Sequence, residues 1–476
     1  MKRGRRSSLV LGAASVICLV TALAGTAMAS PAGGVKGDPQ PELTPFKLGN
    51  LHSSAGSIAM EPNGSLVAAY DIGVGSGRIQ ICVLDRGGKR CASKTILSPL
   101  SNDDTSSTPE VFITSANHVV VLQGACCDRS ADGGDVLYSS TDGGRTFAAP
   151  VRVGFLGVSA AAVVGSQLVF TSGDDHDGSE VESLSLNSPV STPSTVIRSK
   201  AAYDAGLGSY RGGVLLSSDF LGNSFYTTYA EYAKSGDNFN AAASYHTVGT
   251  FPKEQLIGVS GNALLTLQTD GHSAVELRLF NGTGFGAAHS VPGTAGGGPE
   301  DFAVEQDPSG TVHVFSERGL ASPIYALIER STSNGGKTWS APVDLGDGIN
   351  DNGFAAALDS HGAGLVLGAG EALAYPVLAS QGVSFSLKSA SIGKGHSTTG
   401  SGKGSPASAG RAVTLQVERS GKWYNVATTH EHSGGTFSFT IKGTSAGTFR
   451  YRAVASDLAG YLMYGYSNAK SLKVTD

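Results

Sequence analysis

Two segments of this chain are near copies of each other, and no other feature constrains the fold as strongly. Residues 140–147 read Ser-Thr-Asp-Gly-Gly-Arg-Thr-Phe, and residues 332–339 read Thr-Ser-Asn-Gly-Gly-Lys-Thr-Trp. One residue after each copy, the chain continues Ala-Pro-Val. Weaker copies of the ending, a glycine followed by an aromatic residue, occur at Gly236 with Phe239, Gly282 with Phe285, and Gly382 with Phe385. Such duplication predicts a fold made of repeated units.

The repeats have a regular period. With Gly88 included, the turn glycines lie 46 to 56 residues apart, except for one gap of 92 that a degenerate copy near Asn187 fills. The apolar segments that open the units are 46 to 53 residues apart and begin near Gly56, Pro109, Val158, Leu207, Gln255, Asp301 and Gly353. Each unit contains four short strand-like segments and lacks helical periodicity. The sequence therefore predicts an all-β protein, with a β-propeller of seven four-stranded blades expected and six blades as the alternative.

The N-terminal segment predicts export. Four basic residues among the first six precede an apolar run over residues 9–24 and the sequence Ala-Met-Ala ending at Ala29, a pattern typical of a signal peptide cleaved after Ala29. No later segment is apolar over enough residues to cross a bilayer. We expect residues 1–29 to be removed, residues 30–44 to form an extension, and the protein to be secreted, extracellular or associated with the cell wall.

Export permits disulfides, and four cysteines follow the predicted signal peptide. Cys82 and Cys91 flank a short turn at residues 85–88, so we expect them to bridge a hairpin. Cys126 and Cys127 are adjacent. They form either a vicinal disulfide or two separate thiols, and the sequence leaves both alternatives open.

The two full copies match the pattern Ser/Thr-x-Asp/Asn-x-Gly-x-Thr-Phe/Trp, which resembles the Asp box, or BNR repeat, of the sialidase superfamily. The resemblance implies a propeller but specifies no activity. In such a turn the Asp or Asn side chain accepts backbone N–H bonds, the glycine has a positive φ, and the terminal aromatic residue packs under the hairpin. The residues expected in these structural roles are Asp142, Gly144, Phe147, Asn334, Gly336 and Trp339.

The composition changes near Ser389, so we place the propeller at residues 45–388 and a small β-sandwich at residues 389–476. The alternating strands of the second domain, at residues 411–416 and 450–456, resemble immunoglobulin-like or fibronectin-like modules of secreted bacterial proteins. The domain is either a spacer or a sugar-binding module. For the second alternative, the candidate aromatic residues are Trp423, Tyr424, Tyr461, Tyr464 and Tyr466.

Charge distinguishes the two predicted domains. The chain has 34 basic and 39 acidic residues, and removal of the four basic residues of the signal peptide leaves a net charge of −9. Residues 389–476 contain ten basic and four acidic residues, a net charge of +6, so the predicted propeller carries −15. Because nucleic-acid binding depends on a basic surface, we do not expect this protein to bind nucleic acid.

Acidic residues are frequent in the loops that would share one end of the propeller, namely those between blades and those between second and third strands. We expect this end to bind the ligand through Asp103, Asp104, Asp128, Arg129, Asp204, Glu300, Asp301 and Asp351. In one loop, Asp174, Asp175 and Asp177 are close enough in sequence to suit Ca²⁺, although they also fit an ordinary solvated loop. No cofactor is required by the sequence, and calcium is the candidate ion.

Sialoside hydrolysis would require arginines that bind the substrate carboxylate, a tyrosine nucleophile and an acid that activates it. The Arg-Ile-Pro motif of the family does not occur in this chain. Residues that nevertheless fall in the acidic loops and supply these groups are Arg78, Arg129, Arg318, Tyr226, Glu110 and Glu300. A mechanism with two carboxyls roughly 5 to 9.5 Å apart would use Glu110 with Asp104, or Glu300 with Asp301.

These features favour a monomeric protein that binds a glycan or a cell-surface partner through its acidic end. One alternative is an exo-sialidase or another glycoside hydrolase. A second alternative is a wall component that docks other proteins without catalysis.

Overall fold

The computed structural model describes residues 44–49, 56–72, 77–98, 109–123, 135–152, 158–174, 178–186, 194–199, 203–220, 224–233, 238–239, 246–252, 254–268, 274–294, 302–319, 325–349, 354–359, 361–368, 373–377, 381–456 and 465–476. These residues form strands and turns, with one 3-10 turn, η2 (Ser433–Gly435), and no α-helix among them. The prediction of an all-β protein is confirmed. None of the described residues belongs to a helix that is long and apolar enough to span a membrane.

The described residues before position 378 form seven small antiparallel sheets, which we number in chain order. The first sheet contains β2 (Gly56–Met60), β3 (Leu66–Asp71), β4 (Ile79–Leu84) and β5 (Ser93–Leu97). The second contains β6 (Glu110–Ser115), β7 (His118–Gln123), β8 (Val136–Ser140) and β9 (Val151–Arg152). The third contains β10 (Val158–Val164), β11 (Gln167–Asp174), β12 (Gly178–Ser185) and β13 (Ser194–Ser199).

The fourth sheet contains β14 (Tyr203–Tyr210), β15 (Gly213–Phe220) and β16 (Ser224–Ala233), and both β17 (Asn238–Phe239) and β18 (His246–Pro252) pair with β16. The fifth contains β19 (Glu254–Ser260), β20 (Ala263–Gln268), β21 (Val275–Leu279) and β22 (His289–Ser290). The sixth contains β23 (Phe302–Gln306), β24 (Val312–Gly319), β25 (Tyr325–Thr332) and β26 (Val343–Ile349). The seventh contains β27 (Phe354–Leu358), β28 (Gly364–Gly368), β29 (Leu373–Val377) and β1 (Phe46–Lys47).

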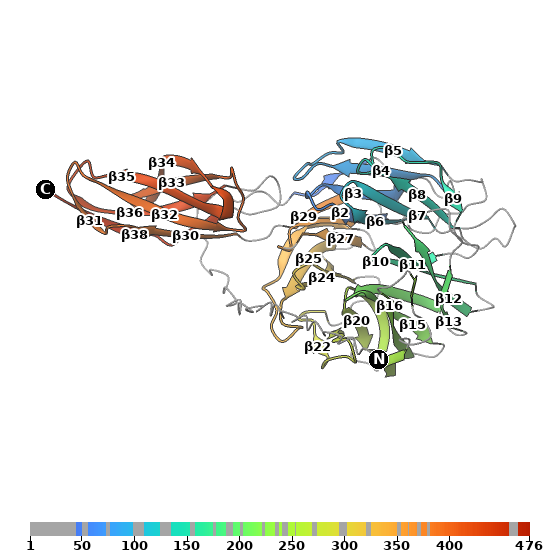
Figure 1. Ribbon diagram of the computed structural model, residues 1–476. Coiled ribbons are helices and arrows are strands. Elements are labelled where there is room, and N and C mark those ends of the chain that lie inside the picture. The colour runs from blue at the N-terminus through green and yellow to red at the C-terminus, as the bar shows by residue number, and fades with distance from the viewer. Residues whose placement is uncertain are drawn as a thin grey trace, which may run out of the picture. The chain divides into compact units, whose positions relative to one another are not determined.

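The first strands of neighbouring sheets lie against one another. In chain order β2, β6, β10, β14, β19, β23 and β27 each contact the next, and β27 contacts β2. Hydrophobic clusters fill each of these interfaces, including the one between the seventh and the first sheet, where Leu365 packs in one cluster with Leu66. Figure 1 shows the sheets following one another around a common centre, from blue through green to orange. Each sheet thus buries its faces against its two neighbours, as expected for repeated β units.

The turns of the two full repeats are built from local hydrogen bonds. Asp142 Oδ1 accepts the backbone N–H of Arg145 at 3.0 Å and of Thr146 at 2.9 Å, and Oδ2 accepts the Thr146 hydroxyl at 2.7 Å. The Thr146 hydroxyl, with help from these backbone N–H groups, lowers the pKa of Asp142 to about 2. Asn334 takes the equivalent position, and its Oδ1 accepts the Thr338 N–H at 3.0 Å. These short-range bonds explain why the turn can be recognised in sequence.

The glycines and aromatic residues of the two turns face the preceding sheet. Gly144 and Gly336 have φ values of 79° and 88°. A Cβ on Gly336 would lie 2.6 Å from His289 Cβ of the fifth sheet, which leaves no room for a side chain. Phe147 packs against the cluster between the first and second sheets, and Trp339 packs against the one between the fifth and sixth. Each turn therefore helps to join two sheets.

The first sheet carries a disulfide at this position instead of an aromatic residue. Cys82 in β4 is bonded to Cys91 before β5, as predicted, and Cys91 packs against the cluster between the seventh and first sheets. Cys126 and Cys127 lie outside the described residues.

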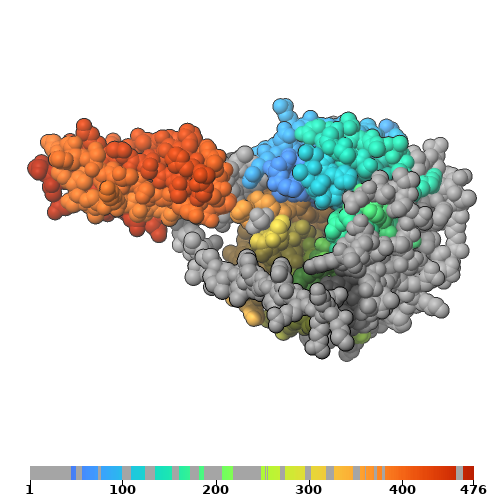
Figure 2. Space-filling model, in the orientation of Figure 1, coloured from blue at the N-terminus to red at the C-terminus, as the bar shows by residue number. Residues whose placement is uncertain are grey.

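The C-terminal residues form a β-sandwich, orange to red in the space-filling view (Figure 2). One sheet contains β30 (Gly382–Leu387), β32 (Ser397–Ser405) and β35 (Thr436–Lys442). The other contains β31 (Ser391–Gly393), β38 (Lys470–Thr475), β36 (Gly447–Ala455), β33 (Ala412–Arg419) and β34 (Lys422–His430), with β37 (Gly465–Tyr466) paired to β36. Both sheets contribute to one core, in which Phe439 and Leu415 meet.

The sandwich begins before the predicted boundary between residues 388 and 389. β30 pairs with β32, and Phe385 lies in the sandwich core, so Gly382 and Phe385 are not part of a repeat turn. The seventh sheet instead takes its fourth strand from the start of the described chain, because β1 pairs with β29 through Phe46 and Ala374. Two segments from opposite ends of the repeat region thus complete one sheet.

Candidate functional site

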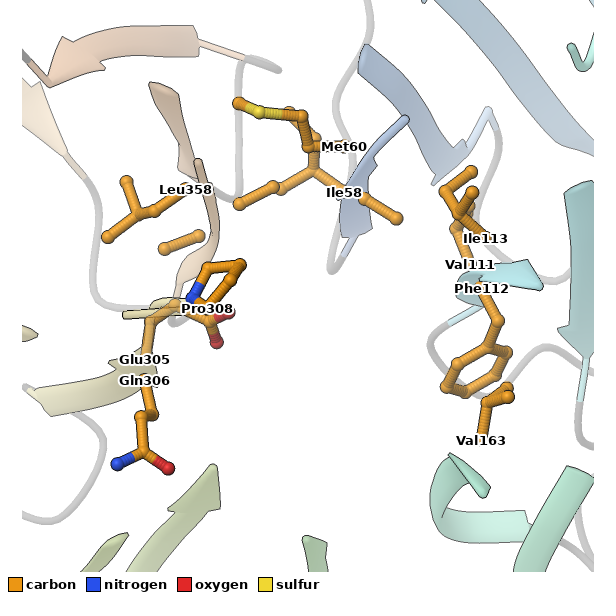
Figure 3. A pocket seen from close by; sticks show the side chains of 13 residues that line it. Ile58, Met60, Val111, Phe112, Ile113, Val163, Glu305, Gln306, Pro308 and Leu358 are labelled. Atoms are coloured by element: carbon orange, nitrogen blue, oxygen red, sulfur yellow. The ribbon is translucent and has the colours of Figure 1, made fainter. Parts of the chain in front are cut away.

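A cavity of about 370 Å³ lies between the first strands of five sheets (Figure 3). Its described lining comes from β2, β6, β10, β23 and β27, together with the turn after β23. The lining residues are Ile58, Ala59, Met60, Val111, Phe112, Ile113, Val163, Glu305, Gln306, Pro308, Ala356, Ala357 and Leu358. Most of these side chains are apolar.

The position of the lining residues in their strands locates the cavity. Residues 58–60, 305–306 and 356–358 are the last residues of β2, β23 and β27, and Pro308 belongs to the turn that leads from β23 into β24. The cavity therefore lies at the end where first strands turn back into second strands. We call this the turn end and the opposite end the loop end.

Glu305 is the only charged residue among the described residues that line the cavity. Figure 3 shows its carboxylate directed from the wall into the open space. The Ser260 hydroxyl donates to Glu305 Oε2 at 3.1 Å. Burial raises the pKa of Glu305 to about 7, against the lowering effect of the Ser260 hydrogen bond and the charge on His313. A neighbouring residue, Gln306, has a structural role, because its Oε1 accepts the backbone N–H of Asn262 at 3.0 Å.

A buried ionic cluster lies behind this wall. His313 Nδ1 is 3.0 Å from Glu329 Oε1, and His313 Nε2 is 3.4 Å from Asp307 Oδ2. Although burial lowers the pKa of His313, hydrogen bonds and charges from Asp307 and Glu329 outweigh it and raise this pKa to about 9. All three side chains are buried, and none lines the cavity. The cluster is therefore a structural ion group rather than part of an accessible site.

Strand register places further acidic residues at the loop end. The first residue of a first strand pairs near the last residue of the second strand, as in Glu110 with Leu122, Tyr203 with Asp219 and Glu254 with Gln268. This edge carries Asp71, Glu110, Asp174, Asp204, Asp219, Glu254 and Glu317 from the first six sheets. It is the edge opposite the cavity.

Glu110 is the candidate catalytic acid that the structure describes best. It opens β6 and is partly exposed, and it does not line the cavity. Burial of its carboxyl raises the pKa of Glu110 to about 7, while a backbone hydrogen bond with Ala161 lowers it in part. Arg78 lies just before β4 with an exposed side chain. Both residues lie at the loop end.

The other candidates are described only as backbone or not at all. Tyr226 pairs with Ser218 in β15, and Arg318 pairs with Ala326 in β25, so both strands are placed. Asp174 and Asp204 lie at the loop-end termini of β11 and β14. The candidates outside the described residues are Asp103, Asp104, Asp128, Arg129, Asp175, Asp177, Glu300, Asp301 and Asp351.

Sequence reasoning missed Glu305 and the cavity around it. The available signal is a charged residue in the otherwise largely apolar segment Phe302–Gln306. Asp204, the one residue predicted to bind ligand that lies within the described ranges, does not line the cavity. In the described part of the chain, no three His, Cys, Asp or Glu side chains are grouped as metal ligands.

No protein-family model matches this chain, and no curated protein matches it. Among solved structures, the chain is similar to the Hadza microbial sialidase Hz136, with 12% identity and a TM-score of 0.38 over 68% of this chain and 66% of that one, just under two thirds of its length. AofleA from Arthrobotrys oligospora has 11% identity and a TM-score of 0.41 over 68% and 96% of the two chains. The α-L-arabinofuranosidase CtGH43 from Clostridium thermocellum has 11% identity and a TM-score of 0.30 over 52% and 95%.

Proposed function

We propose that residues 44–377 form a closed, seven-bladed β-propeller of the Asp-box type, in an exported protein that binds a glycan or a cell-surface partner through its loop end. Three observations support the closed ring: the first strands contact one another cyclically, a hydrophobic cluster fills every interface, and β1 completes the seventh sheet. The paired arrangement of Asp142 and Asn334 in their turns supports the Asp-box assignment.

The observation that carries the binding proposal is the strand register at the loop end. In a propeller the first strands run in the same direction, so Asp174 of the third sheet and Asp204 and Asp219 of the fourth come to one face. Together with the net charge of −15 predicted for the propeller, this register favours a neutral or cationic ligand over an anionic sugar. Calcium bound near Asp174 would be compatible with such a face.

Glycoside hydrolysis is the second candidate, and one observation favours it. A carboxyl with a pKa near 7, as at Glu110, has the protonation behaviour of a general acid at neutral pH. Such a mechanism also requires a second carboxyl at a suitable distance. The apolar cavity at the turn end supplies no such pair among its described lining residues.

The proposal is tested with the secreted form, residues 30–476, on a glycan array and on a panel of fluorogenic sialoside and neutral glycoside substrates, with calcium and with chelator. We expect binding to a neutral or cationic glycan, no turnover, and loss of binding in the double variant Asp204→Asn with Asp219→Asn. The matched control is Asp85→Asn, which changes an aspartate whose side chain is 71% exposed in the β4–β5 hairpin.

Two outcomes would overturn the proposal. Turnover of a substrate that is lost in Glu110→Gln would establish a hydrolase. Equal loss of binding in Asp85→Asn and in the loop-end double variant would show that the loop end is not the binding face.

A further inference from the structure

We propose that the cavity at the turn end is a second binding site, which takes a small organic ammonium ion with an apolar body and holds its charge on Glu305. This site is distinct from the loop end, because its lining residues in β2, β10, β23 and β27 lie toward the opposite termini of those strands, and in β6 its lining begins at Val111 and does not include Glu110. It therefore does not depend on the glycan-binding proposal.

The walls of the cavity select an apolar body. Met60, Phe112, Ile113 and Leu358 line the cavity from three different sheets (Figure 3) and also pack against the hydrophobic clusters between sheets. A volume of about 370 Å³ is at the lower end of the range for small-molecule sites, so the ligand is small. A sugar is disfavoured, because its hydroxyls would lose their hydrogen bonds to water against these apolar side chains.

Glu305 supplies the single charge that such a site needs. Among the described residues it receives one hydrogen bond, from Ser260 to Oε2, while the carboxylate faces the cavity. The nearby imidazolium of His313 is already engaged by Asp307 and Glu329, so this ionic cluster offers no free cation to Glu305. Burial raises the pKa of Glu305 to about 7, although the Ser260 hydrogen bond and the charge on His313 lower it.

The same geometry disfavours the other ligand classes. A carboxylate or phosphate would be repelled by ionised Glu305. A neutral apolar molecule would leave that carboxylate buried with no counter-ion from the ligand, which is costly. A hard metal ion prefers roughly six or more oxygen ligands, and the described lining offers one carboxylate. An ammonium group instead donates charge-assisted hydrogen bonds to the carboxylate.

The test is isothermal titration calorimetry at pH 8, where Glu305 is ionised, with three probes of similar shape: 2-phenylethylammonium, 2-phenylethanol and 3-phenylpropionate. The ammonium ion should bind, and the anion should not. The alcohol should bind at least roughly tenfold more weakly than the ammonium ion, since a hydrogen bond to a charged group typically contributes about that factor in affinity. Glu305→Gln should weaken ammonium binding by roughly the same factor.

The matched control is Glu418→Gln, which makes the same substitution in β33 of the sandwich, outside the cavity lining. It should leave ammonium binding unchanged. Ala356→Phe fills the cavity from the seventh sheet without touching a charge, and it should abolish binding even if Glu305→Gln fails to fold. Absence of ammonium binding to the wild-type protein, equal binding by Glu305→Gln, or undiminished binding by a folded Ala356→Phe would each overturn the proposal.

Discussion

Arg411 and Glu431 form an ion pair that is almost completely removed from solvent. Their Nη2 and Oε1 atoms are 2.5 Å apart, and the side chains are 1% and 0% exposed. Arg411 also donates to the Pro406 carbonyl at 2.8 Å and to the Gln381 side chain. Through these contacts Arg411, just before β33, links Gln381 at the start of the sandwich with Glu431, just after β34. Gly404 is required beside it, since a Cβ there would lie 2.0 Å from both charged side chains.

Removal of one partner of this pair should destabilise the sandwich severely. Glu431→Gln leaves Arg411 buried without its counter-ion, and the expected cost in free energy of unfolding is about 3–5 kcal/mol. Differential scanning calorimetry of the full chain should show a lower transition temperature for the sandwich. The control is Glu418→Gln, which breaks the more exposed pair with Arg450 and should cost less than about 1 kcal/mol. Similar losses in both variants would contradict the importance of burial.

Two glycines with nearly the same backbone conformation should respond differently to alanine. Gly336 and Gly310 have φ values of 88° and 87°, so both substitutions carry a strain of about 1–2 kcal/mol. A Cβ at Gly336 would also lie 2.6 Å from His289 Cβ, whereas one at Gly310 meets nothing within 4 Å. Chemical denaturation should therefore show that Gly336→Ala is the more destabilising by about 1–3 kcal/mol. Equal losses of unfolding free energy in the two variants would mean that the Gly336 turn is not closely packed against His289 of the fifth sheet.

His313 should make stability depend on pH in a defined window. Its pKa is raised from 6.5 to about 9 in the folded chain, so its stabilising contribution is complete below pH 6.5 and is lost as the pH rises through about 9. The difference in unfolding free energy between wild type and His313→Gln should then be larger at pH 6 than at pH 9.5. His361→Gln, which changes an imidazole 41% exposed, is the control for replacing a histidine, and it should cost less free energy of unfolding at pH 6 than His313→Gln does. A pH-independent effect of His313→Gln would argue against a charged His313.

The disulfide of the first sheet should stabilise the chain measurably. Cys82 and Cys91 are nine residues apart in sequence, and closing so short a loop is worth about 2–3 kcal/mol in the chain-entropy account. The double variant Cys82→Ala with Cys91→Ala should lower the thermal midpoint. A reducing agent should lower the wild-type midpoint by more than that of the double variant. An unaltered midpoint in the variant would show that the disulfide does not stabilise the chain.

Local chemistry made parts of the fold predictable from sequence. The side chains of Asp142 and Asn334 bond to backbone groups within four residues, so the octapeptide alone specifies the turn. The hairpin disulfide was predictable for the same reason. Pairings between distant segments were not. β1 contains two residues, and nothing in Phe46–Lys47 indicates that its partner is Leu373–Ala374.

Alternation of polar and apolar residues likewise does not distinguish a strand of the repeats from a strand of the sandwich. For this reason the predicted boundary placed β30 in the propeller, whereas β30 pairs with β32 of the sandwich. In the candidate site, too, the features set by nearby residues were easier to predict than those set by distant segments. Sequence patterns predict the acids of the loop end in loops, whereas the described ones, Asp174 and Asp204, lie at the loop-end termini of β11 and β14. Glu305 could not be recognised, because its significance arises only when side chains from β2, β6 and β27 surround it.

The pairing of β1 with β29 imposes an order on assembly. A polypeptide that emerges from a ribosome or a translocation pore presents Phe46 early, but Ala374 appears only after all seven first strands have emerged. Until then β1 has no strand to join. Once β29 has emerged, its edge stays open until β1 pairs with it, and such an edge can recruit a foreign strand. The last sheet can therefore be completed only after the whole repeat region has been synthesised, and its open edge is a point at which a nascent protein is vulnerable to aggregation.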